Sequence, residues 1–97
     1  MQRREELRMA ARQRLKDALR QLASGETVLL FGSVTRPHAF HERSDVDIAF
    51  IEEPRRISRY GLQARLEEMV RHPIDLIVLP ECRFSRKIEL EGEAWTN

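Results

Sequence analysis

Apolar side chains recur every three or four residues through the first quarter of the chain, as they do in a helix with one buried stripe. This pattern predicts a helix over residues 3–23, ended by Ser24 and Gly25. The same period predicts a second helix over residues 57–71. The inward positions are Leu7, Ala11, Leu15, Ala18, Leu19 and Leu22 in the first helix and Leu62, Leu66, Met69 and Val70 in the second. Both helices therefore require an apolar surface to pack against.

Three shorter apolar runs predict strands over residues 27–31, 44–51 and 74–79. The first run is apolar on both faces, which favours a central place in a sheet. Its end and the start of the second run meet at one polar turn, so we expect these two strands to be antiparallel. The helix between the second and third runs requires a right-handed crossover, and therefore predicts a parallel pair.

The remaining segments complete one domain. Residues 84–91 predict a short helix closed by Gly92, and Ala94 and Trp95 predict an edge strand. With 97 residues there is room for one core but not for a second substrate-binding lobe. We therefore predict a single α/β (α+β) domain over residues 1–97, a small mixed sheet with helices packed against it. We also expect a partner chain or a second copy to complete its site.

Charge and cysteine content narrow the classes of protein further. The net charge of +1 does not favour bulk binding of nucleic acid. Cys82 is the only cysteine, so an internal disulfide is excluded and a reducing, cytoplasmic setting is expected. The charged N-terminal segment does not resemble a signal peptide, and no apolar run approaches the roughly 20 residues of a membrane span.

The outer face of the first predicted helix is basic. It carries Arg3, Arg4, Arg8, Arg12, Arg14, Lys16 and Arg20 against Glu5, Glu6 and Asp17. A surface of this kind can meet RNA or an acidic partner, or can serve only as a solvated helix face. The sequence leaves these interpretations open.

Two aspartates at the start of the second strand are the first candidates for chemistry. Asp45 and Asp47 are two residues apart, so their side chains point to the same face of the strand. Adjacent carboxylates repel each other, and a divalent cation would explain their pairing. As an alternative, the two residues only cap a turn, as single aspartates often do.

A second candidate, Gly32–Ser33, ends the first strand. Glycine lets the backbone approach a ligand closely, and a hydroxyl with the N–H groups of a helix start suits phosphate. The parallel pairing puts the starts of the second and third strands at one sheet edge, so Asp75 should lie beside Asp45 and Asp47. Alternatively, Asp75 is a lone polar residue at a strand's beginning. A phosphate cradle opposite carboxylate metal ligands indicates nucleotidyl transfer.

The order and spacing of these candidates resemble the motif of the polymerase-beta-type nucleotidyltransferase superfamily. The motif here consists of Gly32–Ser33, eleven intervening residues, Asp45-Val46-Asp47 and the later Asp75. The short chain is most similar to the minimal nucleotidyltransferases, called MNT proteins. The resemblance extends from about residue 28 to residue 79. It implies that Asp45 and Asp47 bridge two magnesium ions. It also implies that Asp75 binds one of these ions and helps to deprotonate the attacking hydroxyl.

The resemblance assigns the triphosphate of the incoming nucleotide to Gly32 and Ser33, with Arg36 at the basic position that follows them. Pro37 departs from the family pattern, in which the turn often ends in glycine. Proline fixes φ and lacks an N–H, so this position cannot donate a hydrogen bond to phosphate.

His38 and His41 lie in the segment over residues 37–43, which we expect to be a polar loop. Their spacing is far from a zinc signature, because no cysteine or further histidine lies near them. We expect instead a mobile loop over the triphosphate, with Arg36, Arg43 or a histidine in contact with phosphate.

The activity that the resemblance implies is transfer of AMP from ATP to an acceptor hydroxyl, with release of pyrophosphate. MNT proteins are typically paired with a helical HEPN protein, a ribonuclease-like toxin, and act as antitoxins by adenylylating it, often on tyrosine. Two alternatives remain: nucleotidylation of a small molecule, as in aminoglycoside-modifying relatives, and a non-catalytic module that neutralises its partner by binding.

Overall fold

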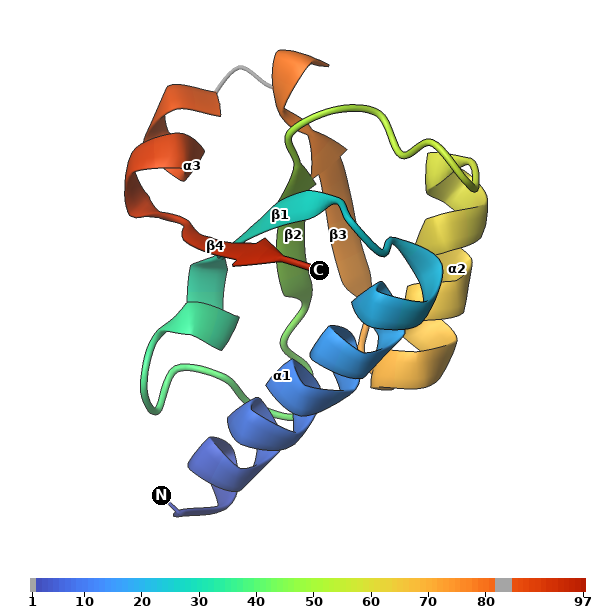
Figure 1. Cartoon of the computed structure of the whole chain (residues 1–97). Helices are drawn as coiled ribbons and strands as arrows, with labels where there is room; N and C mark the ends of the chain where they lie inside the picture. Colours follow the sequence, from blue (N-terminus) through green and yellow to red (C-terminus); the bar gives the residue numbers. More distant parts are fainter. Residues whose placement is uncertain (1, 82–84) are drawn as a thin grey trace.

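The computed structural model describes residues 2–81 and 85–97 (Figure 1). The elements in these ranges are α1 (Gln2–Leu22), β1 (Thr27–Phe31), the 3-10 turn η1 (Gly32–Thr35), β2 (Val46–Phe50), α2 (Arg59–Val70), β3 (Ile74–Val78), the 3-10 turn η2 (Leu79–Glu81), α3 (Ser85–Glu91) and β4 (Glu93–Thr96). The helices and strands predicted from the sequence are all present, with bounds that differ by at most two residues. Cys82 and Phe84 lie outside the described residues. No helix within the described ranges is both long and apolar enough to cross a membrane.

The four described strands form one mixed sheet in the order β3-β2-β1-β4. β1 pairs antiparallel with β2 and with β4, whereas β2 and β3 are parallel. The crossover through α2 accounts for the parallel pair, because a strand reached through a helix re-enters the sheet in the same direction. The predicted central position of β1 and the predicted edge position of the last strand are both confirmed.

The helices cover the two faces of the sheet unequally. α1 and α2 pack on one face, where alternate strand residues such as Val28 and Ile48 form the main core. α3 packs on the other face, where Leu29 and Ile88 belong to a second, smaller cluster. Figure 1 shows α2 and α3 on opposite sides of the sheet. Since α3 has only seven residues, it covers this second face only in part.

Local chemistry accounts for the helix ends. The hydroxyl of Ser58 caps α2 by accepting a hydrogen bond of 3.2 Å from the backbone N–H of Gly61. α1 ends ahead of Gly25, whose φ of +85° lies in the left-handed region that glycine adopts without strain. The backbone of Asn97 accepts a hydrogen bond from Gly25 and donates one to Glu26, which holds the end of β4 beside the start of β1.

The connection from η1 to β2 differs from the polar loop that we predicted. Phe40 is fully buried in the main core, and its ring centroid lies 4.7 Å from that of the buried His72. The backbone N–H of His38 donates a hydrogen bond of 2.9 Å to Glu5 of α1. The connection is therefore anchored to the core and to α1. A single apolar residue in a polar segment carries no periodic signal, so the sequence did not predict this anchor.

Candidate active site

β2 and β3 bring two of the candidate aspartates together. Asp47 and Asp75 are partners in the parallel register, so both side chains point to the sheet face that α3 partly covers. The two carboxyl groups are close enough that Asp75 contributes to raising the pKa of Asp47. The register thus gives the neighbouring positions that the sequence predicts for these two residues.

The surroundings of Asp47 disfavour its charged form. The pKa of Asp47 is raised from 3.8 to about 6, most of all by burial and then by the negative charges of Asp75 and Asp45 and the contact with the Asp75 carboxyl group. A divalent cation would remove this repulsion, and carboxylate oxygens are the donors that Mg²⁺ prefers in proteins. The chemistry of the donor set therefore fits the magnesium that the family resemblance implies.

Gly32 lies directly against Asp47. Its φ is +75°, and a Cβ at this position would overlap Oδ2 of Asp47 and lie 3.2 Å from Cγ of the same residue. Phe31, the last residue of β1, is the register partner of Asp47, which sets this close approach. Residue 32 therefore has to be glycine for the end of β1 to meet the acidic pair.

The turn η1 begins at Gly32 and is closed by its own hydrogen bonds. The hydroxyl of Thr35 donates to the carbonyl of Gly32 at 2.7 Å, and the backbone N–H of Arg36 donates to the carbonyl of Ser33 at 3.1 Å. The N–H that closes the turn thus comes from Arg36. Pro37, the next residue, does not disturb this closure although it has no N–H to donate.

Asp45 stands apart from the Asp47–Asp75 pair. It immediately precedes β2, which begins at Val46, and its side chain is exposed. In residues 2–81 and 85–97, no three Asp, Glu, His or Cys side chains are arranged so that they could hold a metal ion. The fold therefore assembles two of the three carboxylates and leaves Asp45 as a nearby charge.

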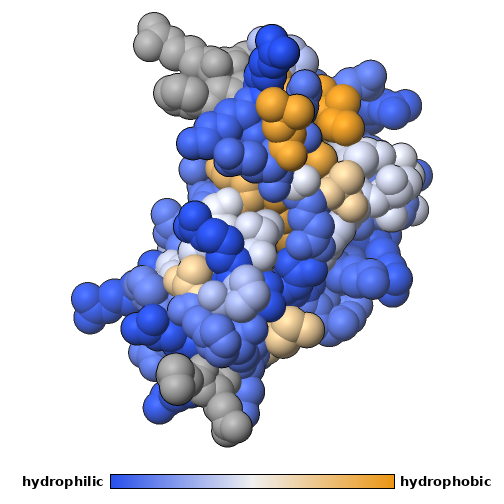
Figure 2. Space-filling model, turned by 90° about the vertical axis from the view of Figure 1, so that its left-hand side faces the viewer, coloured by the Kyte–Doolittle hydropathy of each residue, from blue (hydrophilic) through white to orange (hydrophobic). Residues whose placement is uncertain are grey.

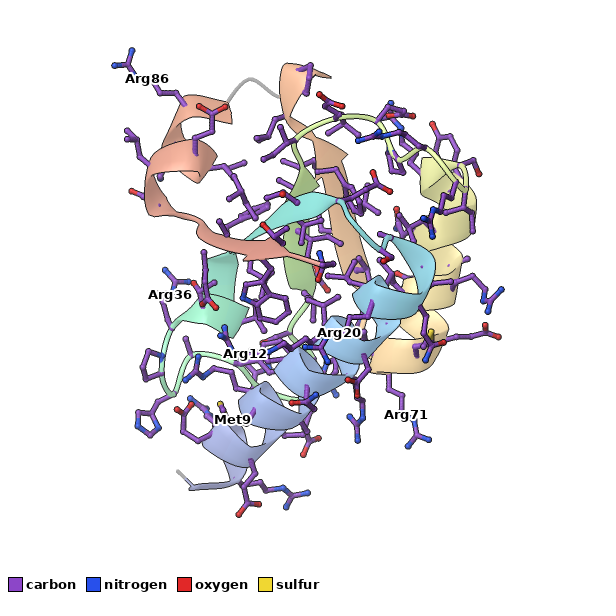
Figure 3. All side chains as sticks on the ribbon, viewed as in Figure 1. Met9, Arg12, Arg20, Arg36, Arg71 and Arg86 are labelled. Carbon is purple, nitrogen blue, oxygen red and sulfur yellow. The ribbon has the colours of Figure 1, made fainter. Side chains whose placement is uncertain are left out.

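A cleft of about 620 Å³ opens between the acidic pair and α3. Its lining combines charged and apolar side chains: Phe31, Gly32, Thr35, Arg36, Asp75, Ile77, Lys87, Ile88 and Glu91. Arg36 and Lys87 come from opposite walls, η1 and α3. Figure 3 shows Arg36 beside η1, on the side of the molecule where α3 lies. Figure 2 shows this side as largely hydrophilic, with apolar surface gathered toward the top.

Three residues of α3 belong to this cleft although the sequence did not single them out: Lys87, Ile88 and Glu91. No motif marks them. The feature that could have pointed to them is the order of the elements, because a helix that leads into an edge strand has to cross the open face of the sheet. The predicted helix over residues 84–91 was not assigned to either face of the sheet, so its contact with the cleft was not predicted.

The residues of the η1–β2 connection that we expected to contact phosphate lie in two separate places. Arg36 lines the cleft, whereas His41 and Arg43 line a separate hollow beside the N-terminal half of α1. The backbone of His38 is held by α1, because its carbonyl also accepts a hydrogen bond of 3.4 Å from Arg4. The structure thus brings only one of these four residues, Arg36, to the lining of the cleft beside the Asp47–Asp75 pair.

A small mixed sheet, a glycine turn against a pair of carboxylates and a cleft that holds both cations and carboxylates are typical of a nucleotidyltransferase domain. The family model described as polymerase beta, nucleotidyltransferase matches residues 13–94. The chain therefore belongs to the polymerase beta nucleotidyltransferase family. This result confirms the predicted fold class and the general class of enzyme.

A solved structure has the same fold. It is described as a crystal structure of a toxin–antitoxin with AMP-PNP, and its TM-score with this chain is 0.66 at 23% sequence identity. The match covers 88% of this chain and 73% of that chain. No curated protein sequence matches the chain significantly.

Proposed function

We propose that this chain transfers AMP from ATP to a hydroxyl group of a partner protein, with Mg²⁺ at the Asp47–Asp75 pair. One observation carries the proposal: Gly32 touches Asp47, and Asp47 is the register partner of Asp75. Nucleotidyl transfer requires such a place, where a phosphate-binding turn meets paired carboxylates. Membership of the nucleotidyltransferase family supports the class of reaction.

Asp45, Asp47 and Asp75 are the residues that would hold the cation. Asp45 is exposed, so its side chain can turn toward the other two carboxylates. Mg²⁺, when bound, supplies positive charge that offsets the charges of the triphosphate and the three carboxylates. The raised pKa of Asp47 is consistent with a position adapted to a cation.

The bonds that change are those of the acceptor hydroxyl and of the α-phosphate. The acceptor oxygen bonds to the α-phosphorus of ATP, the bond from that phosphorus to the bridging oxygen breaks, and pyrophosphate leaves with the electron pair. A carboxylate oxygen of Asp75, which lines the cleft, takes the proton of the hydroxyl. Asp75 therefore acts as the general base of the reaction.

The walls of the cleft would hold the nucleotide. The backbone at Gly32 and Ser33 approaches the phosphates, and the cations of Arg36 and Lys87 meet them from the two walls. The apolar side chain of Ile77 offers a contact for the nucleoside. The cleft therefore combines the charge and the apolar surface that a nucleoside triphosphate requires.

The partner we propose is a helical HEPN toxin, which would make this chain an antitoxin of the MNT type. Two observations support a protein acceptor. The fold is shared with a structure described as a toxin–antitoxin with AMP-PNP. In addition, α3 is a short wall that leaves the cleft open to a second chain.

The test is to incubate the chain with Mg²⁺, the helical protein encoded by the adjacent reading frame, and ATP labelled at the α-phosphate. We expect the label on the partner, and no label when the γ-phosphate carries it. Asp47→Asn should abolish labelling. Asp17→Asn is the matched control, because Asp17 is an exposed aspartate of α1 that only accepts a hydrogen bond from Gln13. Equal labelling by Asp47→Asn would overturn the proposal.

A further inference from the structure

A second hollow lies away from the acidic pair, between α1 and the edge strand β4. It encloses about 480 Å³, and its walls include Met9, Arg12, Lys16 and Arg20 of α1 and Trp95 of β4. Figure 3 shows Met9, Arg12 and Arg20 along α1, below β4 in this view. We refer to this hollow as the α1–β4 groove.

One wall of the groove contains an ion pair between Arg12 and Glu93. Arg12 donates two hydrogen bonds, of 3.0 and 2.5 Å, to the carboxylate of Glu93, and its guanidinium lies 5.3 Å from the ring centroid of Trp95. The indole N–H of Trp95 also donates to Glu93, at 2.7 Å. Trp95, half-buried against the main core, therefore serves to build the wall of the groove and does not project from it.

The other wall carries unpaired positive charge. Lys16 and Arg20 are exposed and one helical turn apart, so they lie on the same side of α1. Within the part of the chain that the structure describes, neither side chain forms an ion pair or a hydrogen bond. Among the residues that line the groove, the one acidic side chain, that of Glu93, pairs with Arg12. The groove thus has a net positive charge.

The shape of the groove suits an extended segment. β4 lines the groove and pairs with β1 alone, so the N–H and C=O groups on its outer edge have no strand partner among the described residues. The stripe from Met9 to Arg20 on α1 rises by about 16 Å. About five residues of an extended chain span the same length.

We infer that the α1–β4 groove binds an extended acidic segment of a partner polypeptide, which adds to the sheet as a strand beside β4. Its backbone would bond to the free edge of β4, and its carboxylates would meet Lys16 and Arg20. A second copy of this chain is disfavoured, because it would bring the same two cations face to face. The inference deepens the proposed function, since it names how the protein acceptor is held.

The test uses a labelled ten-residue peptide of alternating glutamate and threonine, with fluorescence anisotropy as the readout. We expect Lys16→Glu with Arg20→Glu to weaken binding by at least about tenfold. The matched control reverses two exposed cations elsewhere, Arg56→Glu with Arg65→Glu, and should leave binding unchanged. Backbone amides of β4 should also exchange more slowly with solvent when the peptide is bound.

Three results would overturn the inference: equal binding of a lysine–threonine peptide, no effect of the Lys16 and Arg20 reversals, or binding of a single-stranded RNA in place of the acidic peptide. The last result would make the groove a nucleic-acid site. The assay contains neither ATP nor Mg²⁺, so its failure is separate from failure of AMP transfer. Asp47→Asn, which should abolish transfer, should leave peptide binding intact.

Discussion

Asp47 and Asp75 are register partners in the parallel pair of β2 and β3, and the negative charge of Asp75 helps to raise the pKa of Asp47. Neither strand alone produces this contact. It exists because the α2 crossover returns the chain to the same end of the sheet, so that β3 places Asp75 beside Asp47, the aspartate of β2. Two anions held together in this way have to be compensated by protonation or by a cation.

The first prediction concerns the pH dependence of stability in the absence of divalent ions. The folded-state pKa of Asp47, about 6, lies above its ordinary value of 3.8, so folding disfavours the ionised form. The penalty is present above pH 6 and is relieved as the pH falls through 6. Unfolding by urea should therefore show a gain of about 1 kcal/mol between pH 7.5 and 5, after allowance for partial exposure.

The neutral variant Asp47→Asn tests the cause of this gain. It should be more stable than the parent chain at pH 7.5 by at least that amount, and its stability should rise less than that of the parent chain between pH 7.5 and 5. The pKa values of Glu5 and Glu93 are lowered, so those groups do not titrate in this window. A parent chain that lost stability over this interval would contradict the account.

The second prediction concerns the contact between Gly32 and Asp47. Gly32→Ala places a methyl group on Oδ2 of Asp47 at a backbone φ of +75°. The substitution therefore causes both a steric overlap with Asp47 and strain of the backbone at residue 32. Gly25→Ala is the matched control, since φ there is +85° and nothing lies within 4 Å of the added Cβ. We expect a loss of about 1 kcal/mol for Gly25→Ala and about 2–4 kcal/mol for Gly32→Ala in urea unfolding. Equal losses would mean that the contact does not matter.

The third prediction concerns the cation that α3 adds to the cleft. If Lys87 meets the triphosphate, Lys87→Gln should weaken the binding of a fluorescent ATP analogue by about tenfold, which is the loss of one charge-assisted contact. Arg86→Gln removes the same charge from the preceding, exposed position and should change binding less than twofold. A fluorescent AMP analogue, which lacks the β- and γ-phosphates, should bind to the two variants with equal affinity.

The fourth prediction concerns the buried anchor of the η1–β2 connection. Phe40→Ala should lower the free energy of unfolding by about 3–4 kcal/mol, because the side chain is fully buried against His72 and the main core. Phe40→Leu keeps most of the apolar volume and should cost about 1 kcal/mol. A loss below about 1 kcal/mol for Phe40→Ala would show that the connection folds without this anchor.

Much of the architecture followed from the sequence because its signals are periodic. The stripes of α1 and α2 and the alternation of β2 are local patterns, and the single helix between β2 and β3 was enough to set their parallel pairing. The contact between Asp47 and Asp75 could therefore be predicted before any coordinates existed. It needed only strand direction and side-chain alternation.

The parts that escaped prediction depend on contacts between distant segments. Phe40 is buried because of what packs around it, and Lys87 reaches the cleft because α3 crosses the open sheet face. In the α1–β4 groove, Arg12 of α1 contacts Glu93 and Trp95 of β4, so this wall also depends on two distant segments. No spacing within one segment encodes such contacts, since each depends on how two elements are placed in space.

Metal binding tests the central claim most directly. Mn²⁺ in place of Mg²⁺ can be followed by electron paramagnetic resonance in the presence of α,β-methylene-ATP, in which a carbon replaces the bridging oxygen that AMP transfer would release, so the site should hold it without turnover. We predict that the parent chain and Asp17→Asn bind Mn²⁺ equally and that Asp47→Asn loses at least about 90% of the binding. A parent chain that binds no Mn²⁺ with nucleotide present, or an Asp47→Asn variant that binds it equally well, would contradict the account.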